Sequence, residues 1–234
     1  MNPFSPFYSN CELPMFERAG MGDWARYLIY QITQSGTAGR DALRFIGTRS
    51  LVHLRHYKER GLSKGEYVVA DLHRPGDQGD STVPFRSIYL RIERGGPEPE
   101  HMAAIELHLR DFASRQERYA ARDSVEIIHA LPSTDELIAQ AVWGEKARHP
   151  TLIQLALACF DVHKADPGCF WGKAQSFFFA ANVVMLLAEE FGVEYQRISH
   201  TAGMWAGFCI YSAPPHAADT LRVTFKQDIK MANR

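Results

Sequence analysis

The sequence predicts an α+β domain in which an antiparallel sheet packs on buried helices. Two observations lead to this prediction. Segments in which apolar and polar residues alternate fill much of the first two thirds of the chain, and the two most apolar helical segments follow them. With 234 residues, of which 46% are hydrophobic, the chain can bury a sizeable core, and we expect one domain over residues 1–234.

The clearest strand signal is a hairpin. Residues 51–57 and 66–73 are rich in β-forming side chains, and the polar link between them contains two glycines. A third strand is expected at residues 86–93, where isoleucine and leucine alternate with polar residues. Alternation also predicts strands near residues 105–109, 122–131, 208–211 and 221–225. Because a short polar link joins the first two strands, the sheet is predicted to be antiparallel.

Apolar residues at helical spacing predict helices on both sides of the strand region. Residues 23–33 and 38–45 are expected to form two additional N-terminal helices that cover part of the sheet. The capping-box sequence Ser133–Glu136 predicts a further helix. Pro150 is expected to begin a strongly apolar helix that ends near Lys164.

Composition argues against several classes of function. The net charge of −1 arises from 26 basic and 27 acidic residues without a block of either sign, which predicts no nucleic-acid partner and no anionic membrane surface. The longest apolar run, residues 177–188, is shorter than the roughly 20 residues that span a bilayer. Residues 1–20 contain several prolines and are interpreted as an irregular arm, not a secretory signal. We therefore expect a cytoplasmic protein without a transmembrane segment.

The cysteines indicate neither a disulfide scaffold nor a metal site. The chain has four cysteines and no CxxC pair, so we expect them to be reduced and mostly buried. Cys159, His163 and Cys169 are close in sequence, but their spacing fits no zinc pattern. Neither a metal nor an organic cofactor is expected.

The segment that begins at Ser176 is the most informative part of the chain. The stretch Trp171–Leu187 around it opens with polar residues and is then apolar on every side, a pattern typical of a helix buried in a core. This helix is expected to stop at Gly192. At the start of such a helix, backbone N–H groups and the positive end of the macrodipole stabilise the anionic form of a nucleophile. The position suits a thiol, yet the side chain present is a hydroxyl.

The hairpin supplies histidines that could act on residue 176. If Lys58 pairs with Glu66 across the polar link, the antiparallel register places His53 opposite Asp71, with His73 diagonal to it. A carboxylate that faces an imidazole can fix the ring of a base. Alternation places His56 on the apolar face of the hairpin and His53 on the other face. If the helix at Ser176 packs on the apolar face, His56 reaches it, whereas His53 does so only if a bulge shifts the register.

Three sequence segments together resemble a known group of proteins. They are His53-Leu-Arg-His-Tyr57, Glu66-Tyr-Val-Val69 and Gln175-Ser-Phe-Phe-Phe-Ala180. In this order they resemble a group of basidiomycete (mushroom) proteins similar to NlpC/P60 and LRAT-like thiol hydrolases with a permuted chain. That group typically carries Gln-Cys or Asn-Cys, two aromatics, Phe and Ala at the start of the helix. The resemblance covers roughly residues 50–190, the region expected to form the catalytic core.

The resemblance implies a papain-like fold, with an antiparallel sheet packed on a central buried helix, and a thiol hydrolase or acyltransferase activity. Ser176 falls on the nucleophilic cysteine and His53 on the base, while Asp71 or His73 would be the third polar group. An amide, ester or thioester would be cleaved or transferred through a covalent intermediate on residue 176. Backbone N–H groups at the helix start would stabilise the oxyanion. The residues assigned to the substrate or oxyanion side are Gln175 and Trp171.

The chain departs from that group at the nucleophile itself, since residue 176 is not cysteine. Three hypotheses account for this: a cysteine-to-serine inactivated variant, a natural serine enzyme, or a relative that no longer catalyses. The alternative to an enzyme is a binding module that uses the same fold to hold a small molecule or peptide without turnover. The sequence indicates neither the substrate nor the oligomeric state.

Overall fold

The computed structural model describes residues 18–21, 24, 49–60, 65–73, 88–95, 119–120, 122–165, 168–169, 174–201, 204–205, 208–209 and 215–232. The helix expected at 38–45, the strand expected near 105–109 and most of the helix expected at 23–33 lie outside the described residues. The elements are β1 (Arg18–Gly20), β2 (Ser50–Lys58), β3 (Glu66–His73), β4 (Ile88–Gly95), β5 (Tyr119–Ala120), β6 (Arg122–Ile128), β7 (Glu136–Val142), α5 (Leu152–Ala165), β8 (Gly168–Cys169), α6 (Ala174–Glu190), β9 (Gln196–Arg197), β10 (Met204–Trp205), β11 (Phe208–Cys209) and α7 (Pro215–Ala232).

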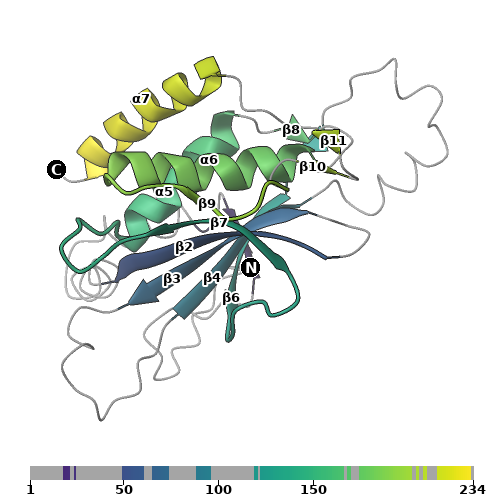
Figure 1. The fold of residues 1–234 in the computed structure, drawn as a ribbon. Helices are drawn as coiled ribbons and strands as arrows, with labels where there is room; N and C mark the ends of the chain where they lie inside the picture. The colour runs from purple at the N-terminus through teal and green to yellow at the C-terminus, as the bar shows by residue number, and fades with distance from the viewer. Residues whose placement is uncertain are drawn as a thin grey trace, which may run out of the picture.

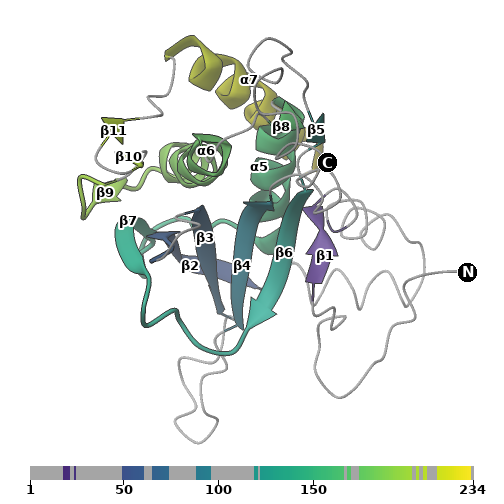
Figure 2. The same ribbon diagram turned by 90° about the vertical axis from the view of Figure 1, so that its right-hand side faces the viewer.

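The described residues form an α+β fold, as the sequence predicted. Seven strands make one sheet in the order β1-β6-β4-β3-β2-β7-β9, and every neighbouring pair is antiparallel. Helices α5, α6 and α7 gather on one face of this sheet (Figures 1 and 2). The fold therefore has a helical layer on a single antiparallel layer, with α6 lying across β2, β3 and β4.

The hairpin of β2 and β3 has the register that the sequence predicted. Lys58 pairs with Glu66 and His53 pairs with Asp71. The register shifts between Leu51 and His53, which marks a bulge in β2. Because of the bulge, Leu51 and Leu54 both enter the helix-facing core, and both are fully buried.

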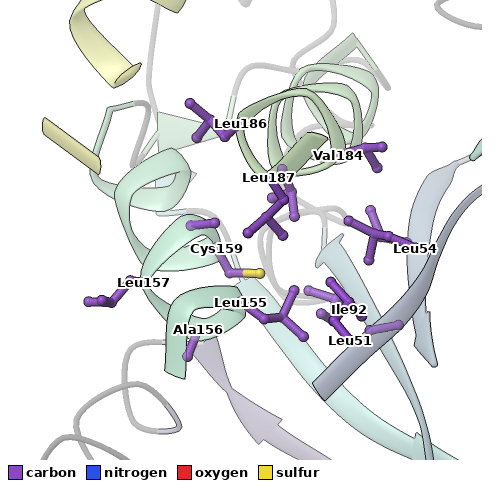
Figure 3. Packing of buried hydrophobic residues seen from close by; sticks show 14 of the residues in the cluster. Leu51, Leu54, Ile92, Leu155, Ala156, Leu157, Cys159, Val184, Leu186 and Leu187 are labelled. Atoms are coloured by element: carbon purple, nitrogen blue, oxygen red, sulfur yellow. The ribbon is translucent and has the colours of Figure 1, made fainter. Parts of the chain in front are cut away.

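The sheet separates two apolar clusters. The larger one lies between the sheet and the helices, and Figure 3 shows side chains of α5 and α6 directed toward Leu51, Leu54 and Ile92. A smaller cluster on the other face is built around Tyr57, Tyr67 and Val69. The two tyrosine rings stack with centroids 5.6 Å apart. Both faces of the central strands are thus buried, and each carries its own set of polar side chains.

The two apolar helices form where the sequence predicted them. Helix α5 runs over Leu152–Ala165 and packs against α6. Helix α6 runs over Ala174–Glu190 and is capped by Gly192, the residue at which the sequence predicted the helix to stop. The φ of Gly192, +68°, is the left-handed conformation that glycine adopts without strain. The N–H of Val193 donates to the carbonyl of Ala188 at 2.8 Å, and that of Gly192 donates to Glu189 at 3.3 Å, which completes a Schellman cap.

The helix predicted from the capping box at Ser133–Glu136 is wrong, because the chain forms β7 from Glu136. The acidic side chains that suggested a local cap bind distant partners instead. Asp135 accepts a 2.6 Å hydrogen bond from the Tyr67 hydroxyl, and Glu136 accepts one of the same length from Ser199. Pairing of β7 with β2 then satisfies the backbone, so tertiary contacts override the local signal.

The strand predicted at 221–225 is also wrong, because these residues belong to α7. Leu221, Phe225 and Ile229 are spaced by four and are all buried, so the apolar period is that of a helix and not of a strand. The strand predicted at 122–131 is shorter than expected, because β6 ends at Ile128. Strand β11 covers Phe208–Cys209, and the other residues of the strand expected at 208–211 lie outside the described residues. At the end of the expected irregular arm, Arg18–Gly20 form β1 and pair with β6.

Within the part of the chain that the structure describes, none of the helices combines the length and the apolar character needed to cross a bilayer.

Candidate functional site

Ser176 lies in the first turn of α6, where the sequence placed a nucleophile. The residue is 8% exposed, and its hydroxyl oxygen accepts a 3.1 Å hydrogen bond from the backbone N–H of Glu66, the first residue of β3. A donor aimed at this oxygen stabilises negative charge on it, and the N-terminal end of the helix dipole acts in the same direction. Both of these contributions favour an anion at position 176.

His56 is the histidine on the helix-facing side of the sheet, as alternation in β2 indicated. Its side chain is fully buried, and its Nε2 lies 2.8 Å from Oε2 of Glu66, whose side chain is also fully buried. This contact is close but does not have the geometry of an aligned hydrogen bond, so neither Nε2 nor Nδ1 of His56 has a hydrogen-bond partner among the described residues. Since buried polar atoms are nearly always paired, an imidazole nitrogen without such a partner is a candidate proton acceptor.

Glu66 connects His56 with Ser176. Its backbone N–H contacts the serine hydroxyl, while its carboxylate contacts the imidazole. The same residue thus holds the nucleophile position through the main chain and the ring through the side chain. A carboxylate against one ring nitrogen fixes the orientation of the imidazole and stabilises its protonated form.

Lys58 completes the buried polar group on this face. Its ammonium lies 3.8 Å from Oε1 of Glu66 and donates a 2.7 Å hydrogen bond to the carbonyl of Thr201. It also lies 5.4 Å from the centroid of the Phe177 ring. The Glu66 carboxylate consequently sits between an imidazole and an ammonium, and the latter side chain is 9% exposed.

The structure places His53, Asp71 and His73 on the other face of the sheet, away from Ser176. Nε2 of His73 donates a 3.1 Å hydrogen bond to Asp71, and Nδ1 of His53 lies 3.9 Å from the same carboxylate. Arg55 donates to His53 at 3.1 Å and lies 3.5 Å from Asp71. Burial raises the pKa of Asp71, but His53, His73 and Arg55 more than offset this effect, so the pKa lies below its ordinary value.

Of the three predicted histidines, the structure links only His56 with Ser176, and it does so through Glu66. The bulge in β2 precedes His53 and does not turn it toward α6, because Arg55 and Tyr57 continue the outer face after it. Gln175 lies in the first turn of α6, and nothing is described of its side chain. Trp171 lies outside the described residues.

Sequence reasoning used Glu66 and Lys58 only to set the hairpin register and missed them as site residues. The period of a strand could have identified them, because side chains two residues apart lie on the same face. Glu66 lies two residues from buried Val68, and Lys58 lies two residues from His56, so both belong to the apolar face. Ionisable side chains on the apolar face of a hairpin are rare unless paired, so their pattern was informative.

Two other kinds of site find no support among the described residues. No group of three or more His, Cys, Asp or Glu side chains there could hold a metal ion. Cys159 is buried in the core, and burial raises the pKa of its thiol, which makes it a poor nucleophile. Comparisons of the chain with protein-family models, curated proteins and solved structures found no match.

Proposed function

We propose that this protein has a papain-like acyl-transfer centre in which residue 176 is the nucleophile, His56 the general base and Glu66 the group that orients the base. The observation that carries the proposal is the double contact of Glu66 with Ser176 and His56. Nucleophile, base and orienter are the three parts of a covalent acyl-transfer centre, and the start of a buried helix is a favourable place for them.

His56 replaces His53 in this proposal because it lies on the helix-facing side of the sheet. Its Nε2 lies against the Glu66 carboxylate, so the proposal assigns the proton transfer to Nδ1. The proposal requires Nδ1 to reach the hydroxyl of Ser176 directly or through one water.

The reaction proceeds in two transfers. His56 removes the proton from residue 176 as its oxygen or sulfur bonds to the carbonyl carbon of an amide, ester or thioester. Backbone N–H groups at the start of α6 stabilise the resulting oxyanion. The protonated His56 then gives its proton to the leaving group, and the acyl group stays on residue 176. Water or a second acceptor finally takes the acyl group, with His56 again acting as the base.

The serine at position 176 limits this chemistry. A serine hydroxyl is hardly ionised near neutral pH, whereas a cysteine in the same field is partly thiolate. The serine form is therefore expected to be slow or inert, and the cysteine form to be reactive.

The proposal is tested with Ser176→Cys and a p-nitrophenyl ester as acyl donor. We expect a burst of p-nitrophenol and an acyl group attached to residue 176, measured by mass spectrometry. Adding His56→Gln should slow acylation by roughly 100-fold or more, the usual contribution of a general base. His53→Gln is the matched control, because this histidine lies on the other face, and it should leave the rate unchanged.

The outcomes separate the proposal from a binding module. A folded Ser176→Cys protein that forms no acyl-enzyme favours binding without turnover. Acylation that survives His56→Gln but is lost in His53→Gln would instead support the base expected from the resemblance. Thermal unfolding of every variant shows whether a lost rate reflects lost folding.

A further inference from the structure

A row of five ionisable side chains crosses the sheet beneath the first turns of α6. The strands β7, β2, β3, β4 and β6 each contribute one residue, and the signs of their charges alternate. In spatial order the row consists of Glu136, Lys58, Glu66, Arg94 and Asp123. Three of the four neighbouring pairs are direct register partners. The fourth, Glu66 with Arg94, continues the β3–β4 register one step beyond Tyr67 and Glu93.

The β4–β6 end of the row is a bidentate ion pair between Arg94 and Asp123. Arg94 donates to the two oxygens of Asp123 at 2.9 and 3.0 Å, and these side chains are 1% and 0% exposed. His163 of α5 adds a 2.8 Å hydrogen bond to the same carboxylate. The guanidinium lies 5.2 Å from the ring centroid of Phe179, so α6 covers the pair.

The other end of the row fixes the turn after β9. Ser199 and Thr201 donate to Oε1 of Glu136 at 2.6 and 2.8 Å, and Lys58 holds the carbonyl of Thr201. The Ser199 hydrogen bond lowers the pKa of Glu136, burial partly opposes this effect, and Thr201 and Lys58 lower it further. Glu136 thus remains a carboxylate that can balance the Lys58 charge.

Lys58 is the only cation of this row placed between the Glu66 carboxylate and the turn after β9. Burying the Glu66 charge is costly unless an opposite charge compensates it, and interactions between charges are strong where water is excluded. Without the ammonium, the negative charge of Glu66 would oppose a second negative charge on residue 176. With it, Glu66 can remain ionised against His56 beside an anionic nucleophile.

Building on the acyl-transfer centre proposed above, we propose that Lys58 is a positioning residue that keeps Glu66 ionised against His56 and favours the anionic form of the nucleophile at position 176. Its hydrogen bond to Thr201 also ties the turn after β9 to this centre. Lys58 acts through Glu66 and the local field and does not itself react with substrate.

The test measures the ionisation of a thiol at position 176 without requiring turnover. In the Ser176→Cys protein, the rate of alkylation by iodoacetamide is followed from pH 5 to pH 10, roughly spanning the range of protein thiols. Adding Lys58→Gln should raise the apparent pKa of this thiol by about one unit and slow alkylation at pH 7 by roughly tenfold. Glutamine retains an N–H donor for Thr201, so the substitution removes the charge while the turn stays tied.

Two further variants make the result decisive. Lys58→Arg keeps the charge and should preserve the thiol profile. Arg91→Met removes a cation from the other face, where Arg91 lies 4.0 Å from the Tyr67 ring centroid, and should leave the profile unchanged. A folded Lys58→Gln protein with an unshifted profile overturns the proposal. If the glutamine variant does not fold, a shifted profile in the folded Lys58→Arg protein overturns it instead.

The role of Lys58 and the proposed acyl transfer can be refuted separately. If Lys58→Gln shifts the alkylation profile but no acyl-enzyme forms, the electrostatic role of Lys58 is supported and the proposed acyl transfer is not. If acylation depends on His56 but the profile does not shift, the acyl transfer is supported and the role of Lys58 is not.

Discussion

The interface between α5 and α7 contains a carboxylate whose ionisation opposes folding. Asp161 of α5 is 2% exposed, and neither of its carboxylate oxygens has a hydrogen-bond partner among the described residues. Burial, and after it the adjacent Asp228 of α7, together raise its pKa from 3.8 to about 7 against a smaller opposing effect of Lys164. Asp161 is therefore neutral in the folded protein at mildly acidic pH and charged in the unfolded chain.

The sign of the pH effect follows from proton binding. Between pH 3.8 and about 7 the folded state holds a proton on Asp161 that the unfolded state has lost, so stability falls as pH rises through this range. At about 1.4 kcal/mol for each pH unit, the full loss is at most ~4 kcal/mol, and relaxation of the protein around the buried charge is expected to reduce it to ~2 kcal/mol.

Asp161→Asn removes this titration while nearly preserving shape, and it provides an N–H group that can donate to Asp228. We expect the variant to match the parent protein near pH 4.5 and to exceed its free energy of unfolding by ~2 kcal/mol at pH 8. Urea unfolding curves at 25 °C, followed by circular dichroism between these pH values, measure the difference. Asp219→Asn is the control, because this α7 side chain is 66% exposed and should show little pH dependence.

An asparagine variant that is less stable than the parent protein at pH 8 would contradict the predicted cost of ionising Asp161. So would a stability difference that stays constant between pH 4.5 and pH 8, because a constant difference would reflect packing and not ionisation.

Two further predictions concern the end of α6 and the outer face of the sheet. Gly192→Ala should lower the free energy of unfolding by ~1 kcal/mol, since an alanine at a φ of +68° is strained although its Cβ would meet no atom within 4 Å. Urea unfolding tests this, and an unchanged midpoint would contradict it. Asp71→Asn should destabilise the protein by less than about 1 kcal/mol at pH 7. The pKa of Asp71 in the folded protein lies below 3.8, so this cost should disappear as pH falls through the folded-state pKa. The alkylation profile of a cysteine at position 176 should stay unchanged in this variant.

Much of the site's frame could be predicted because it depends on local and periodic features. The β2–β3 hairpin follows from two β-rich segments joined by a polar link, and its register placed His53 opposite Asp71. The same alternation placed His56 on the apolar face, where the structure has it. The resemblance assigned the base to His53, and only the packing of α6 on the sheet shows which of the two faces meets Ser176.

The elements that could not be predicted are those whose local signals compete with distant partners. Glu136 resembled a capping residue but accepts hydrogen bonds from Ser199 and Thr201, which are remote in sequence. The charge row is a second example, because its five members come from five strands and become neighbours only when the sheet is assembled in its final order.

The sequence by itself determined the α+β class, the β2–β3 register, the apolar helices α5 and α6 and the glycine cap of α6 at Gly192. Each of these rests on the period of apolar residues or on the backbone freedom of one glycine, which act over a few residues. Tertiary structure alone decided that residues 136–142 form a strand, that Leu221 begins a helical stripe, and that Glu66 joins Ser176 to His56. These outcomes depend on burial against segments far away in the chain. Such burial outweighs local preferences for helix or strand, which are worth only about 1 kcal/mol.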